Sequence, residues 1–228
     1  MSFRRAGPGN DSNVRTTSLA HSTWPDVDDR PLVLVPVGSL EQHGPHLPLD
    51  TDTTIAVAVS EGVAEALTGT TDTGILVAPA LGYGASGEHQ EFPGTVSIGH
   101  DALRVLLIEL VRSLSTWTGR VVIVNGHGGN VRTLEAAVSQ LIAEQHDVAW
   151  VPCAFGTAMD AHAGHAETSV MLHLAPARVD MTRAVVGNTA NIAELLPTLV
   201  ASGVAAVSPT GVLGNPTGAT LPSIVAVG

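Results

Sequence analysis

Residues 38–52 constrain the chain more than any other stretch, because they place metal-binding side chains directly behind a strand-like run. Residues 32–37 (LVLVPV) are apolar and predict a buried strand. The fifteen residues that follow contain one Glu, two His and two Asp, although only 14% of the chain is charged. In an open α/β sheet, ligands bind just outside the carboxyl ends of the strands. We therefore expect this loop to supply half of a metal site.

The remaining pattern alternates short apolar runs with amphipathic stretches. It predicts strands over residues 32–37, 75–79, 120–124 and 148–152, and helices over residues 53–67, 101–117, 131–145 and 170–174. This order is typical of an α/β fold, and we expect a three-layer sandwich with a largely parallel central sheet. The last fifty residues contain several Gly and Pro turns and are expected to be rich in loops.

The N-terminal end has a different composition. Residues 1–27 are rich in Gly, Ser, Thr, Asn and Asp and show no periodicity. We expect them to form a flexible arm, in which Trp24 is the residue that could dock on the core. A single domain over residues 28–228 is expected to follow, since the hydrophobic content of 44% is enough for a sizeable core.

Composition also limits the classes of function. The net charge is −11, and no cluster of basic residues is larger than Arg4-Arg5, which argues against nucleic-acid binding. No segment has the roughly eighteen uninterrupted apolar residues of a membrane span. The single cysteine, Cys153, cannot form an internal disulfide, and this suits a reducing compartment. We expect a cytoplasmic protein with neither nucleic-acid nor membrane partners.

Two further loops carry His or carboxylate beside Gly, namely residues 125–130 and 160–167, and each lies near a predicted strand end. His127, in the first of them, sits in Gly-rich backbone that lets a ligand approach closely. Nitrogen and oxygen ligands without Cys suit Zn²⁺, Mn²⁺ or Fe²⁺. The alternative is that these polar residues only cap and order their loops. Convergence of three such loops on one sheet edge favours a metal site.

A long Gly-rich segment separates the second predicted strand from the next helix. Residues 81–99 (LGYGASGEHQEFPGTVSIG) contain too much Gly for a helix, and unstructured loops of this length are usually functional or disordered. We expect this loop to face the substrate through Tyr83, Glu88, His89 and Phe92.

Three motifs in this order, SLEQHGPHLPLDTD, VNGHGGN and HAGHAETS, together resemble the creatininase (creatinine amidohydrolase) family over residues 31–218. The segment YGASGEHQEFPGTVSIG is most similar to that of an actinobacterial branch that cuts a modified precursor peptide near its end. The resemblance implies a homo-oligomeric hydrolase of C–N amide bonds that uses two divalent metal ions, Zn²⁺, Fe²⁺ or Mn²⁺.

The resemblance also implies a ligand set. One ion would be held by Glu41, Asp52 and His127, and the other by His43 and Asp52, so that Asp52 bridges the two. In creatininase itself, a Glu two positions after the motif His completes the second set, and here that position is Gly129.

The third motif offers a replacement for that carboxylate. We expect Glu167 to take its place at the second ion. By resemblance, His162 matches the catalytic His of the family and would donate a proton to the leaving amine. His165 occupies a variable position of the motif, where we expect no more than a substrate contact.

Three functions remain in competition. The first is a peptidase that cleaves a C-terminal amide bond of a modified precursor peptide, with that peptide as its partner. The second keeps the metal ions but hydrolyses a small formamide or a creatinine-like lactam. The third is a non-catalytic metal-binding scaffold.

Overall fold

The central sheet is fully parallel in the computed structural model, which describes residues 17–71, 73–154 and 160–220. Its four strands stand in the order β2-β1-β3-β4, and each neighbouring pair is parallel. The strands are β1 (Leu32–Val37), β2 (Ile75–Val77), β3 (Arg120–Asn125) and β4 (Val148–Pro152).

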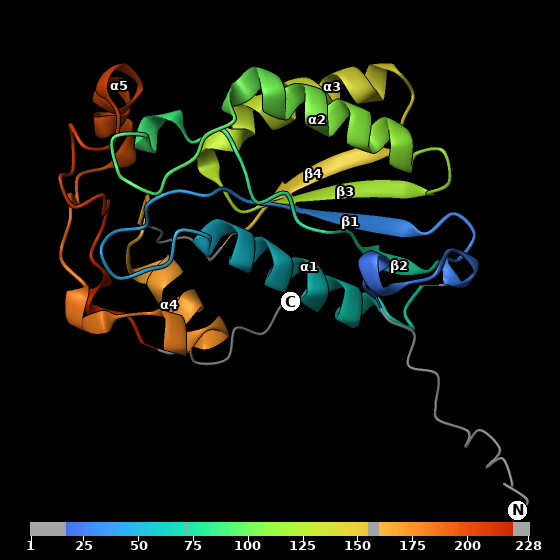
Figure 1. The fold of residues 1–228 in the computed structure, drawn as a ribbon, viewed down its shortest axis with the longest axis horizontal. Coiled ribbons are helices and arrows are strands. Elements are labelled where there is room, and N and C mark those ends of the chain that lie inside the picture. The colour runs from blue at the N-terminus through green and yellow to red at the C-terminus, as the bar shows by residue number, and fades with distance from the viewer. Residues whose placement is uncertain (1–16, 72, 155–159, 221–228) are drawn as a thin grey trace, which may run out of the picture.

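Helices cover both faces of this sheet. Helices α2 and α3 lie on one face, and α1 and α4 lie on the other, while α5 stands at one end of the molecule (Figure 1). The α-helices of the described residues are α1 (Thr51–Leu67), α2 (Gly99–Leu114), α3 (Val131–Ala143), α4 (His165–Leu174) and α5 (Ile192–Ser202). The predicted three-layer α/β sandwich is confirmed.

The two-residue period of the strands explains the layers. Val33 and Val35 of β1 belong to a buried cluster with Leu103 of α2, and Leu34 between them belongs to a separate cluster with Ala64 of α1. Successive side chains of a strand point to opposite faces, so an almost continuous apolar run supplies two hydrophobic surfaces at once. The carboxyl ends of these strands then carry the polar loops.

Some helix boundaries differ from the prediction. Helix α2 begins at Gly99 rather than after Asp101, and α4 begins at His165, five residues before the predicted start. Helix α5 was not expected at all, since it contains Pro197, and proline removes one helical hydrogen bond. Its N-terminus is capped by Asn191, whose side-chain oxygen accepts a hydrogen bond from the backbone of Ala193.

Residues 1–16 of the expected arm lie outside the described residues, and residues 17–27 contain two short 3-10 turns. The N–H of Val77 donates a 2.7 Å hydrogen bond to the carbonyl of Thr17, so this end of the segment is attached to β2. Trp24 is 88% exposed and does not dock on the core. The boundary at residue 28 stays a prediction.

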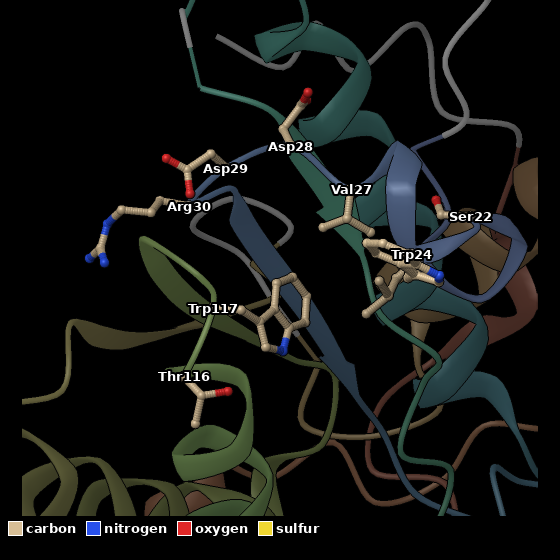
Figure 2. A pocket seen from close by; sticks show the side chains of 9 residues that line it. Ser22, Trp24, Val27, Asp28, Asp29, Arg30, Thr116 and Trp117 are labelled. Carbon is tan, nitrogen blue, oxygen red and sulfur yellow. The ribbon is translucent and has the colours of Figure 1, made fainter.

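A pocket of about 810 Å³ lies beside this segment. Trp24 and Trp117 line it together with Arg30 and Thr116 (Figure 2). Arg30 and Thr116 precede β1 and β3, so the pocket lies at the amino ends of the strands, opposite to the polar loops. Within the described part of the chain, no helix has the length and apolar character that crossing a membrane requires.

Candidate metal centre

The polar loops at the carboxyl ends of the strands meet in one buried group of side chains. The loop after β1 supplies Glu41 and His43, and the first turn of α1 supplies Asp52. His127 is the second residue after the end of β3. The segment before α4 and its first turn complete the group with His162 and Glu167. The side chains predicted as ligands therefore lie together, although they span 127 positions of the chain, from 41 to 167.

A first cluster consists of Glu41, Asp52 and His127, whose ligand atoms all lie within 4.8 Å of one another. Nε2 of His127 is 3.2 Å from Oε2 of Glu41, and its Nδ1 is 3.2 Å from Oδ2 of Asp52. Glu41 is fully buried, and neither of its oxygens has a hydrogen-bond partner among the described residues. A buried carboxylate is strongly disfavoured unless it is paired, and Glu41 is paired with His127 and His89 through contacts that do not meet hydrogen-bond geometry. These three side chains thus fit a divalent cation.

A second cluster consists of His43, His162 and Glu167, again with ligand atoms within 4.8 Å of one another. Nε2 of His43 lies 3.0 Å from Oδ1 of Asp52. Asp52 therefore directs one oxygen toward each cluster, which is the arrangement of a bridging carboxylate. Ser39 holds it there by donating a 2.7 Å hydrogen bond to Oδ2.

His89 joins a third group with Glu41 and His162. It comes from the 3-10 turn η3 (Gly87–His89) in the long Gly-rich loop, and its Nε2 lies 3.3 Å from Oε1 of Glu41. The sequence suggested a substrate contact for His89, but the structure buries this side chain behind Glu41.

The four buried histidines of the site divide into two that are charged and two that are neutral. Burial is the largest influence on His43 and opposes its charged form, but the charge and hydrogen bond of Asp52, together with the charges of Glu167 and Glu41, outweigh it and raise the pKa of His43 to about 10. His127 likewise has a pKa well above its ordinary value, because Glu41 and Asp52 overcome its burial. Burial raises the pKa of Glu41, yet His127 brings it down to about 2. Two imidazolium groups thus balance the buried carboxylates.

The other two imidazoles are neutral. Burial, followed by repulsion from His43, lowers the pKa of His162. Burial, followed by repulsion from His162, lowers the pKa of His89 to about 3. Both rings therefore present a lone pair at neutral pH.

Gly129 is enclosed by the site. A Cβ atom there would lie 2.5 Å from Oε1 of Glu88 and 2.6 Å from the carbonyl oxygen of Ala85, and even closer to Nε2 of His127. Glu88 therefore fills the space into which a side chain at Gly129 would point. The Glu88 side chain is 29% exposed, and its Oε1 is 3.7 Å from Nε2 of His127.

Three of the residues predicted to contact substrate lie farther out. Tyr83 is 52% exposed. Phe92 packs against a cluster that includes Leu199 of α5. His165 is exposed at the start of α4, where its backbone N–H bonds to Asp160.

Sequence reasoning overlooked two residues that organise the centre. Gln42 contacts His89 through its side chain and His162 through its main chain. Asn130 donates to the carbonyl of Gly38 and accepts from the N–H of Ala85, which ties three loops together. Both residues lie inside the motifs that carried the family resemblance, and this location is the sequence feature that could have identified them.

Comparisons with known proteins agree with the geometry. The chain matches the family Creatininase, described as creatinine amidohydrolase, over residues 20–222. It is 60% identical over 190 residues to a mycofactocin precursor peptide peptidase of Mycolicibacterium smegmatis, covering 83% of this chain and 76% of the relative. Its identity to the protein of that name from Mycobacterium ulcerans is 56% over 208 residues, with 90% and 80% covered.

Solved structures of creatininases have the same fold. A crystal structure of creatinine amidohydrolase matches 90% of each chain with a TM-score of 0.72 and 28% identity. A mutant creatininase described as the Zn-Zn type matches 90% of each chain with a TM-score of 0.70 and 28% identity. A structure described as creatininase Mn matches the same share with a TM-score of 0.68 and 26% identity.

Proposed function

The chain belongs to the creatininase family, and from this we propose that it is a two-metal peptidase that cuts an amide bond near the C-terminal end of a modified precursor peptide in mycofactocin biosynthesis. Membership makes it a metal-dependent hydrolase of amide bonds. The peptide substrate is supported by the names of relatives that are 55–60% identical to it.

The ligands follow the clusters. We propose that Glu41, Asp52 and His127 hold one ion, and that His43, Asp52 and Glu167 hold the other. The observation that carries this proposal is Glu41, a fully buried carboxylate whose oxygens face the imidazoles of His127 and His89 but make no hydrogen bond of regular geometry among the described residues. The donor set of imidazole and carboxylate suits Zn²⁺, Fe²⁺ or Mn²⁺.

When bound, two such ions supply a water nucleophile at neutral pH and polarise the scissile carbonyl. The chain itself does the rest. Ser39 orients Asp52, and the burial of the centre excludes bulk water from the charged groups. Two side chains have the chemistry to move a proton to the leaving amine, His162 through Nδ1 and Glu88 through its carboxylate.

Metal analysis of the purified chain tests the centre. We expect close to two divalent ions per chain, and far fewer in Asp52→Ala. Asp50→Ala is the matched control, because Asp50 lies two positions away, is half exposed and pairs with Arg178. One ion or none in the unchanged protein, or equal content in both variants, would refute a bridged two-metal site.

Substrate assays then separate the three functions. Release of a short C-terminal fragment from the modified precursor peptide, detected by mass spectrometry, supports the peptidase. Turnover of creatinine or a formamide with no peptide cleavage would replace it by the small-amide hydrolase. Full metal content without any hydrolysis would support the third function, a non-catalytic metal-binding scaffold.

We also propose that the chain works as a homo-oligomer in the cytoplasm. Its exposed apolar side chains support an assembly, since Ile192, Leu196 and Val200 repeat every four residues on the surface of α5. Light scattering coupled to size-exclusion chromatography tests this directly, and a monomeric mass would contradict it.

A further inference from the structure

The hydrogen bonds around the second cluster show which ring nitrogen of each imidazole can bind a cation. Nδ1 of His43 lies 3.1 Å from the carbonyl oxygen of Glu41. A carbonyl oxygen only accepts, so Nδ1 keeps its hydrogen, and Nε2, which lies 3.0 Å from Oδ1 of Asp52, is the atom that gives up its proton when a cation binds. Histidines that bind metals commonly donate their other ring N–H to a carbonyl in this way.

His162 repeats this arrangement with its ring atoms exchanged. Its Nε2 lies 2.8 Å from the carbonyl oxygen of Gln42 and 3.2 Å from the side-chain nitrogen of the same residue. That amide nitrogen has two hydrogens, and it contacts His89 at 2.8 Å and the carbonyl of Gly211 at 3.2 Å, so Nε2–H of His162 donates to the carbonyl and Nδ1 holds the lone pair. The carbonyl of Gln42 stays beside His162, because two hydrogen bonds of the Gln42 side chain fix the loop at this residue. Its side-chain oxygen accepts from the N–H of Gly44 at 2.9 Å, and its side-chain nitrogen donates to the carbonyl of Gly211 at 3.2 Å.

The two imidazoles and Glu167 lie close enough together to share a cation. The ring centroids of His43 and His162 are 4.4 Å apart, and the ligand atoms of these two residues and Glu167 fall within 4.8 Å of one another. Oε2 of Glu167 accepts a 2.6 Å hydrogen bond from the N–H of Ala163, which orients the carboxylate. His162 is only 8% exposed, which is a poor position for exchanging protons with solvent.

His89 has the opposite tautomer, although it also belongs to a possible metal group. Its Nδ1 lies 2.8 Å from the side-chain nitrogen of Gln42, which is the donor atom of that amide. Nδ1 of His89 therefore accepts, and Nε2–H points toward Glu41. The lone pair of this ring is already taken by the Gln42 amide, so it is not available to a cation, even though the ring centroid lies 4.5 Å from that of His162.

We propose that His162 is a ligand of the second ion through Nδ1, together with His43, Asp52 and Glu167. This inference rests on the two-metal function proposed above and changes the role expected for His162 from the sequence. Gly129 has no side chain to offer this ion, and the imidazole from the third motif supplies the donor instead. Glu88, which is partly exposed and lies beside His127, is then the group left to carry the proton.

The test is metal affinity rather than activity. The full chain is depleted of metal and titrated with Zn²⁺ against a competing chelator, as the unchanged protein, His162→Ala and His89→Gln. Even an outer-shell partner of a ligand contributes about 10–100-fold to metal affinity, so we expect His162→Ala to weaken the second ion by about 100-fold or more. His89→Gln should leave the second ion unchanged, because His89 contacts Glu41 of the first set and the amide of Gln can still donate there.

Imidazole added to His162→Ala separates a lost ligand from a damaged fold. Free imidazole should restore the second ion in the cavity left by the side chain, and a misfolded variant would not recover it. Nitrogen NMR of the histidine rings provides a check without any substitution, since Nδ1 of His162 should shift when Zn²⁺ binds.

Two results would overturn the inference, and they can be told apart. If His162→Ala binds two ions with unchanged affinity, His162 is not a ligand and the two-metal function stands. If the unchanged protein binds fewer than two ions, the two-metal function fails, and the role of His162 fails with it.

Discussion

Ser39 donates a 2.7 Å hydrogen bond to Oδ2 of Asp52, and both side chains are buried. The other oxygen of Asp52 lies 3.0 Å from Nε2 of His43. The hydroxyl thus holds the carboxylate in the one orientation that turns an oxygen toward each proposed ion. Hydrogen bonds from outside the ligand set commonly fix ligands in this way.

Ser39→Ala should therefore weaken metal binding without removing a ligand. We expect the affinity for divalent ions to fall about 10–100-fold, as is typical when an outer-shell partner is lost. The free energy of unfolding of the metal-free protein should fall by about 1–3 kcal/mol, because a buried oxygen loses a donor. Chelator competition and chemical denaturation measure the two effects.

Ser60→Ala provides the control for that substitution. Ser60 is another fully buried serine, placed in α1, and it donates to the carbonyl of Ala56 away from the site. It should leave metal affinity unchanged. Equal metal affinities in the two variants would show that Ser39 does not position Asp52.

Adjacent glycines give a second prediction. A methyl group on Gly129 would overlap the space of His127 and Glu88 and approach the backbone of Ala85, whereas no described atom lies within 4 Å of a Cβ at Gly128. Gly129→Ala should displace His127 and lower both metal content and thermal stability. Gly128→Ala should change neither. Similar metal content and melting temperatures for the two variants would mean that the loop adapts freely.

The layers of this fold follow from patterns that are local in the chain. The run over residues 32–37 has to be buried on both faces, and the amphipathic stripe from Leu103 onward predicts the helix that covers one of them. Helix α5 could not be predicted in the same manner. Pro197 argues against a helix locally, and burial of Leu199 against the cluster that contains Phe92 compensates for it.

The site was predictable to the extent that its residues follow strands. Side chains after parallel strands meet at one sheet edge, which is why the loops of Glu41 and His127 could be expected to converge, while their assignment to one ion came from the family resemblance. The tautomer of His162 could not be predicted, because it depends on a carbonyl 120 positions away, that of Gln42. That Glu88 fills the space beside Gly129 likewise becomes visible only when the two loops are in place.

Loading the metal-free protein with cations should release protons. Metal binding needs a deprotonated nitrogen, but the pKa of His43 is raised to about 10 and that of His127 also lies well above its ordinary value. At neutral pH both rings are therefore charged, and we expect about two protons released per chain. Because the proton competes with the cation, affinity should rise with pH and level off above about pH 10.

Titration calorimetry in buffers of different ionisation enthalpy measures this release. The observed heat should vary with the buffer in proportion to the number of protons transferred. A heat that is the same in every buffer would mean that both rings are already neutral in the metal-free protein, contrary to their contacts with Glu41 and Asp52.

Glu88→Gln tests which group carries the proton. Hydrolysis of an amide requires that a proton from the attacking water reach the nitrogen of the leaving amine. A carboxylate can take and return that proton, and an amide of the same size cannot. General acid–base groups contribute about 100- to 10,000-fold, so we expect kcat to fall within that range while metal content stays at its original value.

Glu91→Gln is the matched control, since Glu91 lies three positions further along the same loop and is exposed. It should retain full activity and both ions. If Glu88→Gln instead loses a metal ion, Glu88 is a ligand. If it keeps full activity and both ions, the proton must pass through another group, and His162 with its free Nδ1 becomes the carrier again. Metal content and kcat, measured on the same preparations, therefore decide between the two residues.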